Sequence, residues 1–172
     1  MRTLVLGGIR SGKSRWAEAV LAGEERVRYL ATGPDPGDDA SWAARVAAHR
    51  DRRPASWTTV ETDDVATHLR DDPVTPSLVD DLGGWVTRVR DRCGWEHGSV
   101  GADIDDLAAA VAAFTGPLVL VSPEVGLAVV AATVSGRRFA DDIGLLNQRV
   151  ADSCDRVVLV VAGQPLMIKT AP

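Results

Sequence analysis

The sequence of 172 residues contains only two cysteines and no long apolar run. Cys93 and Cys154 are far apart and form no Cys-x-x-Cys pair, so we expect no disulfide and a reduced, cytoplasmic setting. The longest apolar stretches, such as Val157 to Ala162, are too short to cross a bilayer. The apolar Thr3–Leu6 runs straight into glycines, without the core of a signal peptide. These absences argue against a membrane span and against a disulfide-rich secreted domain.

Basic residues are fewer than acidic ones. The formal net charge is −5 at pH 7, and only 2 of the 19 basic residues are lysines. A protein that binds nucleic acid without sequence preference must neutralise phosphates, so this balance disfavours a nucleic-acid partner. One of the two lysines, Lys13, stands among glycines near the N-terminus.

The amino-acid composition is ordinary for a globular protein, and the length fits one domain over residues 1–172. Short β-branched runs alternate with helical stretches, which predicts an α/β fold with a mainly parallel sheet and helices on both faces. The predicted strands are Thr3–Leu6, Val27–Ala31, Trp57–Glu61, Ser77–Asp81, Leu118–Ser122 and Val157–Ala162, with a short edge strand at Leu166–Ile168. The predicted helices are Lys13–Ala22, Asp38–Arg52, Gly84–Arg92, Ile104–Phe114 and Arg137–Cys154.

The strongest motif is Gly7-Gly8-Ile9-Arg10-Ser11-Gly12-Lys13-Ser14, which fits G-x-x-x-x-G-K-[ST] at every fixed position. It follows a predicted strand and precedes a predicted helix, and this context disfavours a chance glycine-rich turn. Glycines let successive backbone N–H groups point at phosphate oxygens, and the helix N-terminus adds positive potential. In such a P-loop, Lys13 would reach the β- and γ-phosphates and Ser14 would ligate Mg²⁺.

A P-loop also needs an acid at the end of a neighbouring strand to hold the hydrated Mg²⁺. Asp80 follows directly on the apolar run Ser77–Val79 and is the first candidate, with Glu124 as its competitor. The alternative for Asp80 is the N-cap of a helix, a position where aspartate is common.

A second informative segment, Arg45–Pro54, places one histidine among four arginines. Arg45 lies one helical turn before His49, and further arginines lie about one turn after it. These cations favour a neutral imidazole and would attract a polyphosphate, which makes the ring a competent nucleophile. The alternative is a half-buried structural histidine at the end of a solvated helix, and the residues alone favour that interpretation.

The spaced motifs resemble those of the bifunctional adenosylcobinamide kinase / adenosylcobinamide-phosphate guanylyltransferase family of cobalamin biosynthesis. The similarity runs nearly end to end, and only its P-loop is shared widely with other families. The segments that carry it are Gly7–Ser14, Tyr29–Thr32, Arg45–Pro54, Trp57–Glu61, Leu78–Asp80, Glu124–Gly126, Leu146–Arg149 and Val158–Gly163.

The resemblance implies two reactions on one RecA-like P-loop NTPase fold. ATP or GTP phosphorylates the aminopropanol hydroxyl of adenosylcobinamide. GTP then transfers GMP to a histidine, which passes it to adenosylcobinamide phosphate to give adenosyl-GDP-cobinamide. The matching histidine is His49, so the resemblance favours this residue as the nucleophile. It also implies a corrinoid partner and a homotrimer. The nucleotide contacts that it implies beyond the P-loop are Ala31, Thr32, Gly33, Arg50, Asp51, Arg52, Arg53, Glu61 and Asp80.

The chain departs from the family pattern in the loop Ser122–Gly136. Pro123 stands where members often have Asn, and Ala131 and Val134 stand where they often have Pro and Arg. These changes put a phosphate or corrinoid contact, and with it one of the two activities, in question. Two other functions stay open at this point: a P-loop small-molecule kinase with a structural histidine, and a RecA-type nucleotide-dependent ATPase.

Overall fold

The computed structural model describes residues 1–33, 37, 40, 44, 47, 50, 51 and 53–170. The predicted helix Asp38–Arg52 falls mostly outside these ranges, as does the candidate nucleophile His49. Within them, none of the helices combines the length and the apolar character that a bilayer span requires.

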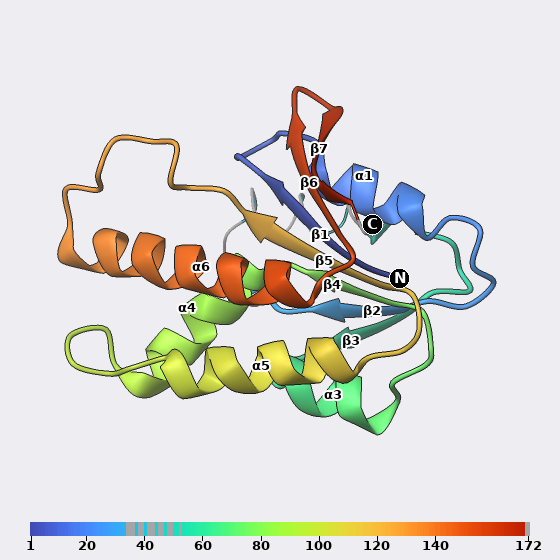
Figure 1. Cartoon of the computed structure of the whole chain (residues 1–172), viewed down its shortest axis with the longest axis horizontal. Helices are drawn as coiled ribbons and strands as arrows, with labels where there is room; N and C mark the ends of the chain where they lie inside the picture. The colour runs from blue at the N-terminus through green and yellow to red at the C-terminus, as the bar shows by residue number, and fades with distance from the viewer. Residues whose placement is uncertain are drawn as a thin grey trace.

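A sheet in the order β3-β2-β4-β5-β1-β6-β7 runs through the described part of the chain (Figure 1). Six of its strands are parallel to one another, and β7 pairs antiparallel with β6. This arrangement confirms the predicted mainly parallel sheet. The strands are β1 (Arg2–Gly7), β2 (Arg28–Ala31), β3 (Thr58–Glu61), β4 (Ser77–Asp80), β5 (Leu118–Pro123), β6 (Arg156–Val161) and β7 (Gln164–Thr170).

Helices cover both faces of the sheet, as the sequence predicts (Figure 1). Among the helices whose bounds are given below, α1 packs on one face, and the other four lie on the opposite face. Successive residues of β1 show the division, because Leu4 packs with the larger group of helices and Val5 packs with α1. The helices are α1 (Lys13–Val20), α3 (Val65–Asp71), α4 (Leu82–Cys93), α5 (Gly101–Ala113) and α6 (Val134–Ser153).

Several helices begin two or three residues before the position that apolar periodicity predicts. The start of α6 is set by Thr133, whose side chain accepts a hydrogen bond from the backbone N–H of Gly136 at 3.1 Å. In the same way Asp81 caps α4 by accepting from the N–H of Gly84 at 2.8 Å. Capping side chains fix where a helix begins, whereas apolar residues show only where it becomes buried.

The β6–β7 hairpin also differs from the prediction. The predicted strand Val157–Ala162 ends one residue earlier, because Ala162 and Gly163 have φ angles of 50° and 76° and form the turn. Positive φ at both turn residues matches the twist of an antiparallel hairpin. The predicted edge strand Leu166–Ile168 is longer than expected, since β7 pairs with β6 from Gln164 to Thr170.

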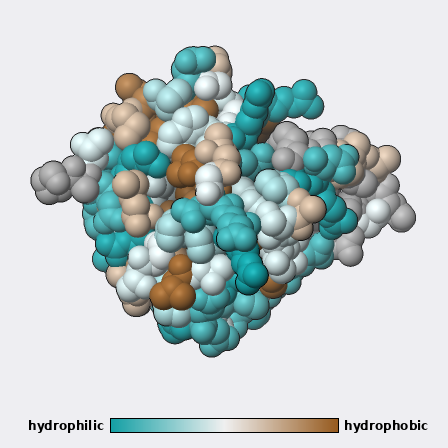
Figure 2. Space-filling model, turned by 90° about the vertical axis from the view of Figure 1, so that its right-hand side faces the viewer, coloured by the Kyte–Doolittle hydropathy of each residue, from teal (hydrophilic) through white to brown (hydrophobic). Residues whose placement is uncertain are grey.

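Exposed large apolar side chains of the described residues gather at two places. One is the β5–α6 connection with the start of α6, and the other is the β6–β7 hairpin. By contrast, the side of the molecule where β1 begins is mainly hydrophilic, with hydrophobic side chains only in small separate groups (Figure 2). The first set comprises Leu127, Val129, Val130 and Val134, and the second comprises Val161, Leu166, Met167 and Ile168.

Candidate active site

The loop between β1 and α1 has the backbone conformation that its glycines predict. Gly12 has a φ of 93° and stands at the N-cap of α1, a conformation that side chains other than hydrogen rarely allow. A Cβ on Gly7 would lie 2.8 Å from the carbonyl oxygen of Val160, so this position has no room for a side chain. The loop is closed by the N–H of Ser11, which donates to the carbonyl of Gly8 at 3.2 Å.

The first turn of α1 keeps most of its backbone donors available for a ligand, although the N–H of Lys13 donates to Ser11 Oγ at 3.3 Å. Its N-cap residue has no capping side chain, unlike those of α3, α4 and α6. The Nζ of Lys13 lies 3.4 Å from the carbonyl oxygen of Gly8 and so folds back over the loop. Uncapped N–H groups beside a lysine ammonium form the kind of site that binds phosphate oxygens.

The turn of the β6–β7 hairpin supports this loop from the side. The N–H of Gly163 donates to the carbonyl of Ser11 at 2.8 Å, and a Cβ on Gly12 would lie 3.2 Å from the Cα of Gly163. The phosphate-binding loop is therefore packed against a segment more than a hundred residues away in the sequence.

Asp80 lies beside the P-loop, where the sequence places the metal-binding acid. Its carboxylate accepts a hydrogen bond from the Ser14 hydroxyl at 3.3 Å and one from the Tyr29 hydroxyl at 2.6 Å. The competitor Glu124 accepts a 2.6 Å hydrogen bond from the N–H of Gly126 within its own loop. Of the two acids, only Asp80 has a described hydrogen bond to a P-loop side chain. Its role as a metal ligand stays a prediction.

The predicted strand Ser77–Asp81 is one residue too long. The strand ends at Asp80, and Asp81 is the residue that caps α4. The helix cap therefore belongs to Asp81 and not to Asp80. Burial and the nearby charge of Asp80 raise the pKa of the Asp81 carboxyl.

Tyr29 connects the acid with the arginine segment. Its hydroxyl contacts Asp80, and the guanidinium of Arg53 lies over its ring, 3.6 Å from the ring centre. Burial, followed by the charge of Asp80, raises the pKa of the Tyr29 phenol, so the hydroxyl remains a hydrogen-bond donor at neutral pH. The sequence analysis assigns Tyr29 no role of its own, although it is the only tyrosine and lies two residues before the end of β2.

The other predicted nucleotide contacts lie at the same edge of the sheet. Ala31 pairs with Asp80 across β2 and β4, and Arg88 donates to the carbonyls of Thr32 and Gly33 at 3.0 and 2.6 Å. The Thr32 side chain is fully buried and donates to the backbone carbonyl of Asp81, so its hydroxyl is engaged inside the protein.

Two arginines contact the side chains of β3. Arg50 forms an exposed ion pair with Glu61 at 3.5 Å, and Arg53 donates to Thr59 Oγ1 at 2.8 Å. Asp51 is exposed, whereas His49 and Arg52 lie outside the described residues. Arg53 thus lies over Tyr29, which contacts Asp80, and Arg50 lies at the end of β3 beside Glu61.

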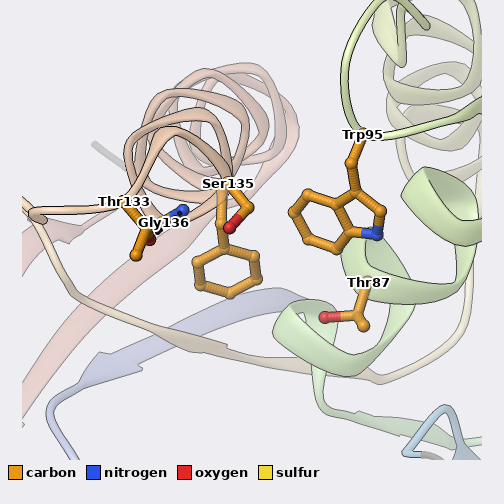
Figure 3. A pocket seen from close by; sticks show the side chains of 6 residues that line it. Thr87, Trp95, Thr133, Ser135 and Gly136 are labelled. Atoms are coloured by element: carbon orange, nitrogen blue, oxygen red, sulfur yellow. Dashed lines mark hydrogen bonds between the residues drawn. The ribbon is translucent and has the colours of Figure 1, made fainter.

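An open cavity of about 660 Å³, widely exposed to solvent, lies between α4 and the first turns of α6 (Figure 3). Trp95, in the loop after α4, contributes its indole to one side. The lining residues are Thr87, Trp95, Thr133, Ser135, Gly136 and Phe139. No sequence motif predicts this cavity, because its walls come from segments far apart in the chain.

The fold and the loop at Gly7–Ser14 define a P-loop nucleotide-binding α/β enzyme. The type III secretion ATPase of pathogenic bacteria has a similar fold, with a TM-score of 0.60 at 16% identity over 92% of this chain and 50% of that one. The sequence matches the CobU family, described as cobinamide kinase / cobinamide phosphate guanyltransferase, over residues 3–168. The chain belongs to this family.

Curated relatives agree with this assignment. The bifunctional adenosylcobalamin biosynthesis protein CobP of Pseudomonas aeruginosa is 38% identical over 100% of this chain and 99% of its own length. The bifunctional adenosylcobalamin biosynthesis protein CobU of Salmonella typhimurium is 37% identical over 98% of this chain and 100% of its own length.

Proposed function

We propose that the enzyme phosphorylates adenosylcobinamide with ATP or GTP and then transfers GMP from GTP through His49 to adenosylcobinamide phosphate. The product is adenosyl-GDP-cobinamide. The observation that carries the proposal is the contact of Asp80 with both Ser14 and Tyr29, in a chain of this family. It joins the P-loop to the arginine segment in which His49 stands.

In the kinase step the P-loop binds and orients the triphosphate. Backbone N–H groups at the start of α1 and the Lys13 ammonium stabilise the charge that spreads over the transferred phosphoryl group. The oxygen of the substrate hydroxyl forms a bond to the γ-phosphorus, the bond to the β-phosphate oxygen breaks, and the hydroxyl proton is released.

Mg²⁺ is the cofactor that these residues fit. The Ser14 hydroxyl and the Asp80 carboxylate are hard oxygen ligands whose atoms lie 3.3 Å apart, so one ion can contact both. No cluster of three acidic, histidine or cysteine side chains suited to a metal occurs among the described residues. A P-loop site needs none, because phosphate and water oxygens complete the coordination. When bound, Mg²⁺ would neutralise phosphate charge.

In the second reaction an imidazole nitrogen of His49 attacks the α-phosphorus of GTP, and pyrophosphate leaves. A phosphate oxygen of adenosylcobinamide phosphate then attacks the same phosphorus and releases the imidazole. Arg50, Arg52 and Arg53 would neutralise the charge of the phosphates during both displacements. Glu61 would accept hydrogen bonds from the guanine or the ribose after release from its ion pair with Arg50.

Labelled GTP tests the covalent step. With GTP carrying ³²P at the α-phosphate, the wild-type protein should retain a label that is stable to base and labile to acid. His49→Ala should retain none, and His97→Ala, which alters a fully exposed histidine, should label like the wild type. An unlabelled wild-type protein that still phosphorylates adenosylcobinamide would instead be a P-loop small-molecule kinase.

The chain is also proposed to act as one domain in a cytoplasmic homotrimer. The support for association is β7, an edge strand whose seven residues are all exposed and include Leu166, Met167 and Ile168. Unpaired apolar edges are surfaces that a second copy can cover. Light scattering should give three times the chain mass for the wild type and a lower mass for Ile168→Lys. The cytoplasmic setting is supported by two free cysteines and by the use of ATP and GTP.

A further inference from the structure

We infer that the cavity between α4 and the start of α6, together with the apolar side chains of the preceding loop, binds the corrin ring of the substrate. The inference rests on the proposed function and specifies which surface takes the corrinoid. The cavity residues are Thr87, Trp95, Ser135 and Phe139, and the loop residues are Leu127, Val129 and Val130.

The cavity has the chemistry of a site for a large ligand whose outer edge is uncharged. An indole and a phenyl ring provide apolar surface, and the hydroxyls of Thr87, Thr133 and Ser135 lie around them (Figure 3). None of the lining residues is ionisable, so the site is unsuited to a phosphate. A corrin ring carries methyl groups and neutral amides around its edge, which match apolar walls with a few hydroxyls.

The position of Trp95 is fixed by hydrogen bonds on both sides of the cavity. Its indole N–H donates to Asp91 Oδ1 at 2.7 Å, and its backbone carbonyl accepts from Arg138 of α6 at 2.8 Å. A site that is already ordered loses less conformational entropy when a ligand binds.

A buried ion pair holds the two helices that form the walls. Arg90 of α4 donates to both carboxylate oxygens of Asp142 of α6, at 2.6 and 2.8 Å. The same guanidinium donates to the carbonyl of Gly98 at 2.6 Å and so secures the loop that carries Trp95. The spacing of α4 and α6 around the cavity is thus set from within the protein.

The loop between β5 and α6 adds apolar side chains that are exposed to water when no ligand is bound. Leu127, Val129 and Val130 are 85%, 96% and 77% exposed. Contiguous exposed aliphatic residues are uncommon on a surface with no binding role. The loop ends at Thr133, and Ser135 follows in the first turn of α6; both line the cavity, so the loop leads directly into it.

This surface begins at the phosphate-binding loop. The N–H of Glu124, at the start of the β5–α6 loop, donates to the carbonyl of Gly7 at 3.1 Å. On the other side, Thr87 lies six residues after the α4 cap Asp81, a distance of about 9 Å along a helix. In Figure 1 the α4–α5 loop and the start of α6 both lie beyond the carboxyl ends of the strands. A ring bound there can direct its aminopropanol arm toward the P-loop.

Binding measurements with adenosylcobinamide and GTP in parallel test the inference. The corrinoid is quantified by its visible absorbance after ultrafiltration in dim light, and GTP is quantified by radiolabel. We expect Trp95→Ala and Val129→Asp each to raise the Kd for adenosylcobinamide by about tenfold or more and to leave the Kd for GTP unchanged. Unchanged GTP binding also shows that the variants are folded. Val74→Asp is the matched control, because Val74 is an exposed valine in the turn before β4, at the opposite end of the sheet.

Each contrary result has a distinct meaning. If the wild type binds adenosylcobinamide and both variants bind it equally well, the cavity is not the corrinoid site and the proposed function stands. If Trp95→Ala weakens GTP binding while its circular dichroism matches that of the wild type, the cavity takes the nucleotide base and the inference is wrong. If the wild type binds GTP but no adenosylcobinamide, the proposed function itself fails.

Discussion

The Tyr29 hydroxyl lies 2.6 Å from Asp80 Oδ2, and it donates the shortest described hydrogen bond to the acid beside the P-loop. Because burial and the charge of Asp80 raise the pKa of the phenol, the hydroxyl donates this hydrogen bond at neutral pH. It therefore fixes the orientation of the carboxylate, so that Oδ1 faces Ser14. Tyr29 acts on the proposed metal site as a positioning residue.

Tyr29→Phe should weaken this orientation without removing the acid. A hydrogen bond to a charged group contributes about 1.5–3 kcal/mol, so we expect about a tenfold higher Mg²⁺ concentration for half-maximal kinase rate. The measurement is the kinase rate as a function of Mg²⁺ at saturating ATP. A lower rate with an unchanged Mg²⁺ requirement would show that Tyr29 serves only the packing of β2.

Replacement of glycine by alanine at two positions should change the free energy of unfolding in opposite directions. Gly12→Ala places a Cβ at a φ of 93° and near the hairpin turn, so it should weaken ATP binding and lower the free energy of unfolding by about 1–2 kcal/mol. Gly144→Ala lies within α6 with open space around the new methyl group, and it should raise the free energy of unfolding by about 0.5–1 kcal/mol. Urea denaturation and ATP titration measure both, and equal effects at the two positions would contradict the loop geometry.

Removal of one partner of the buried pair Arg90–Asp142 should be costly. Asp142→Ala leaves the guanidinium buried without its carboxylate, and we expect a loss of about 3–5 kcal/mol in the free energy of unfolding. The double change Arg90→Met and Asp142→Leu removes both charges and should recover most of that loss. Urea denaturation distinguishes the cases. A double variant as unstable as Asp142→Ala would show that packing, rather than the unpaired charge, dominates.

The Arg2–Asp155 contact should make stability depend on pH in the acid range. Hydrogen bonds from Arg2 hold the pKa of the Asp155 carboxyl below its usual value of 3.8. A lowered pKa in the folded state stabilises the protein above the unfolded pKa, and this stabilisation disappears as pH falls through the folded pKa. Asp155→Asn should therefore be less stable than the wild type at pH 7 and nearly equal to it well below pH 3.8. A difference that persists unchanged in acid would exclude this carboxylate as the cause.

The sequence predicted the P-loop because each of its parts is local. A strand, a glycine-rich turn and a helix in immediate succession can be recognised from neighbouring residues alone. The strands of the parallel sheet were predicted for the same reason, since each is a short β-branched run. Their ends were less certain, and the shift of the helix cap from Asp80 to Asp81 shows why: two adjacent aspartates differ only in the direction of their side chains.

The remaining parts of the site depend on contacts between distant segments. Tyr29 reaches Asp80 across 51 positions, and Arg90 reaches Asp142 across 52. No periodicity or motif marks such pairs, because strand order alone brings β2 next to β4, and helix packing alone brings α4 next to α6. From the sequence, the loop Cys93–Gly101 with Trp95 fits either a lid or a simple connection, and only the position of α6 shows that Trp95 lines a cavity. The assignment of His49 came from the family resemblance.

The hydrogen bond from Gly163 to the P-loop carbonyl of Ser11 couples the position of the β6–β7 hairpin to that of the P-loop. The turn sits at one end of β7, and the edge of β7 is the surface proposed to be shared between copies. If dilution separates the copies, the hairpin loses its contacts with the neighbouring copy. Its turn would then support the P-loop less rigidly. By thermodynamic reciprocity, ATP or GTP would then favour assembly to the same extent that assembly tightens nucleotide binding.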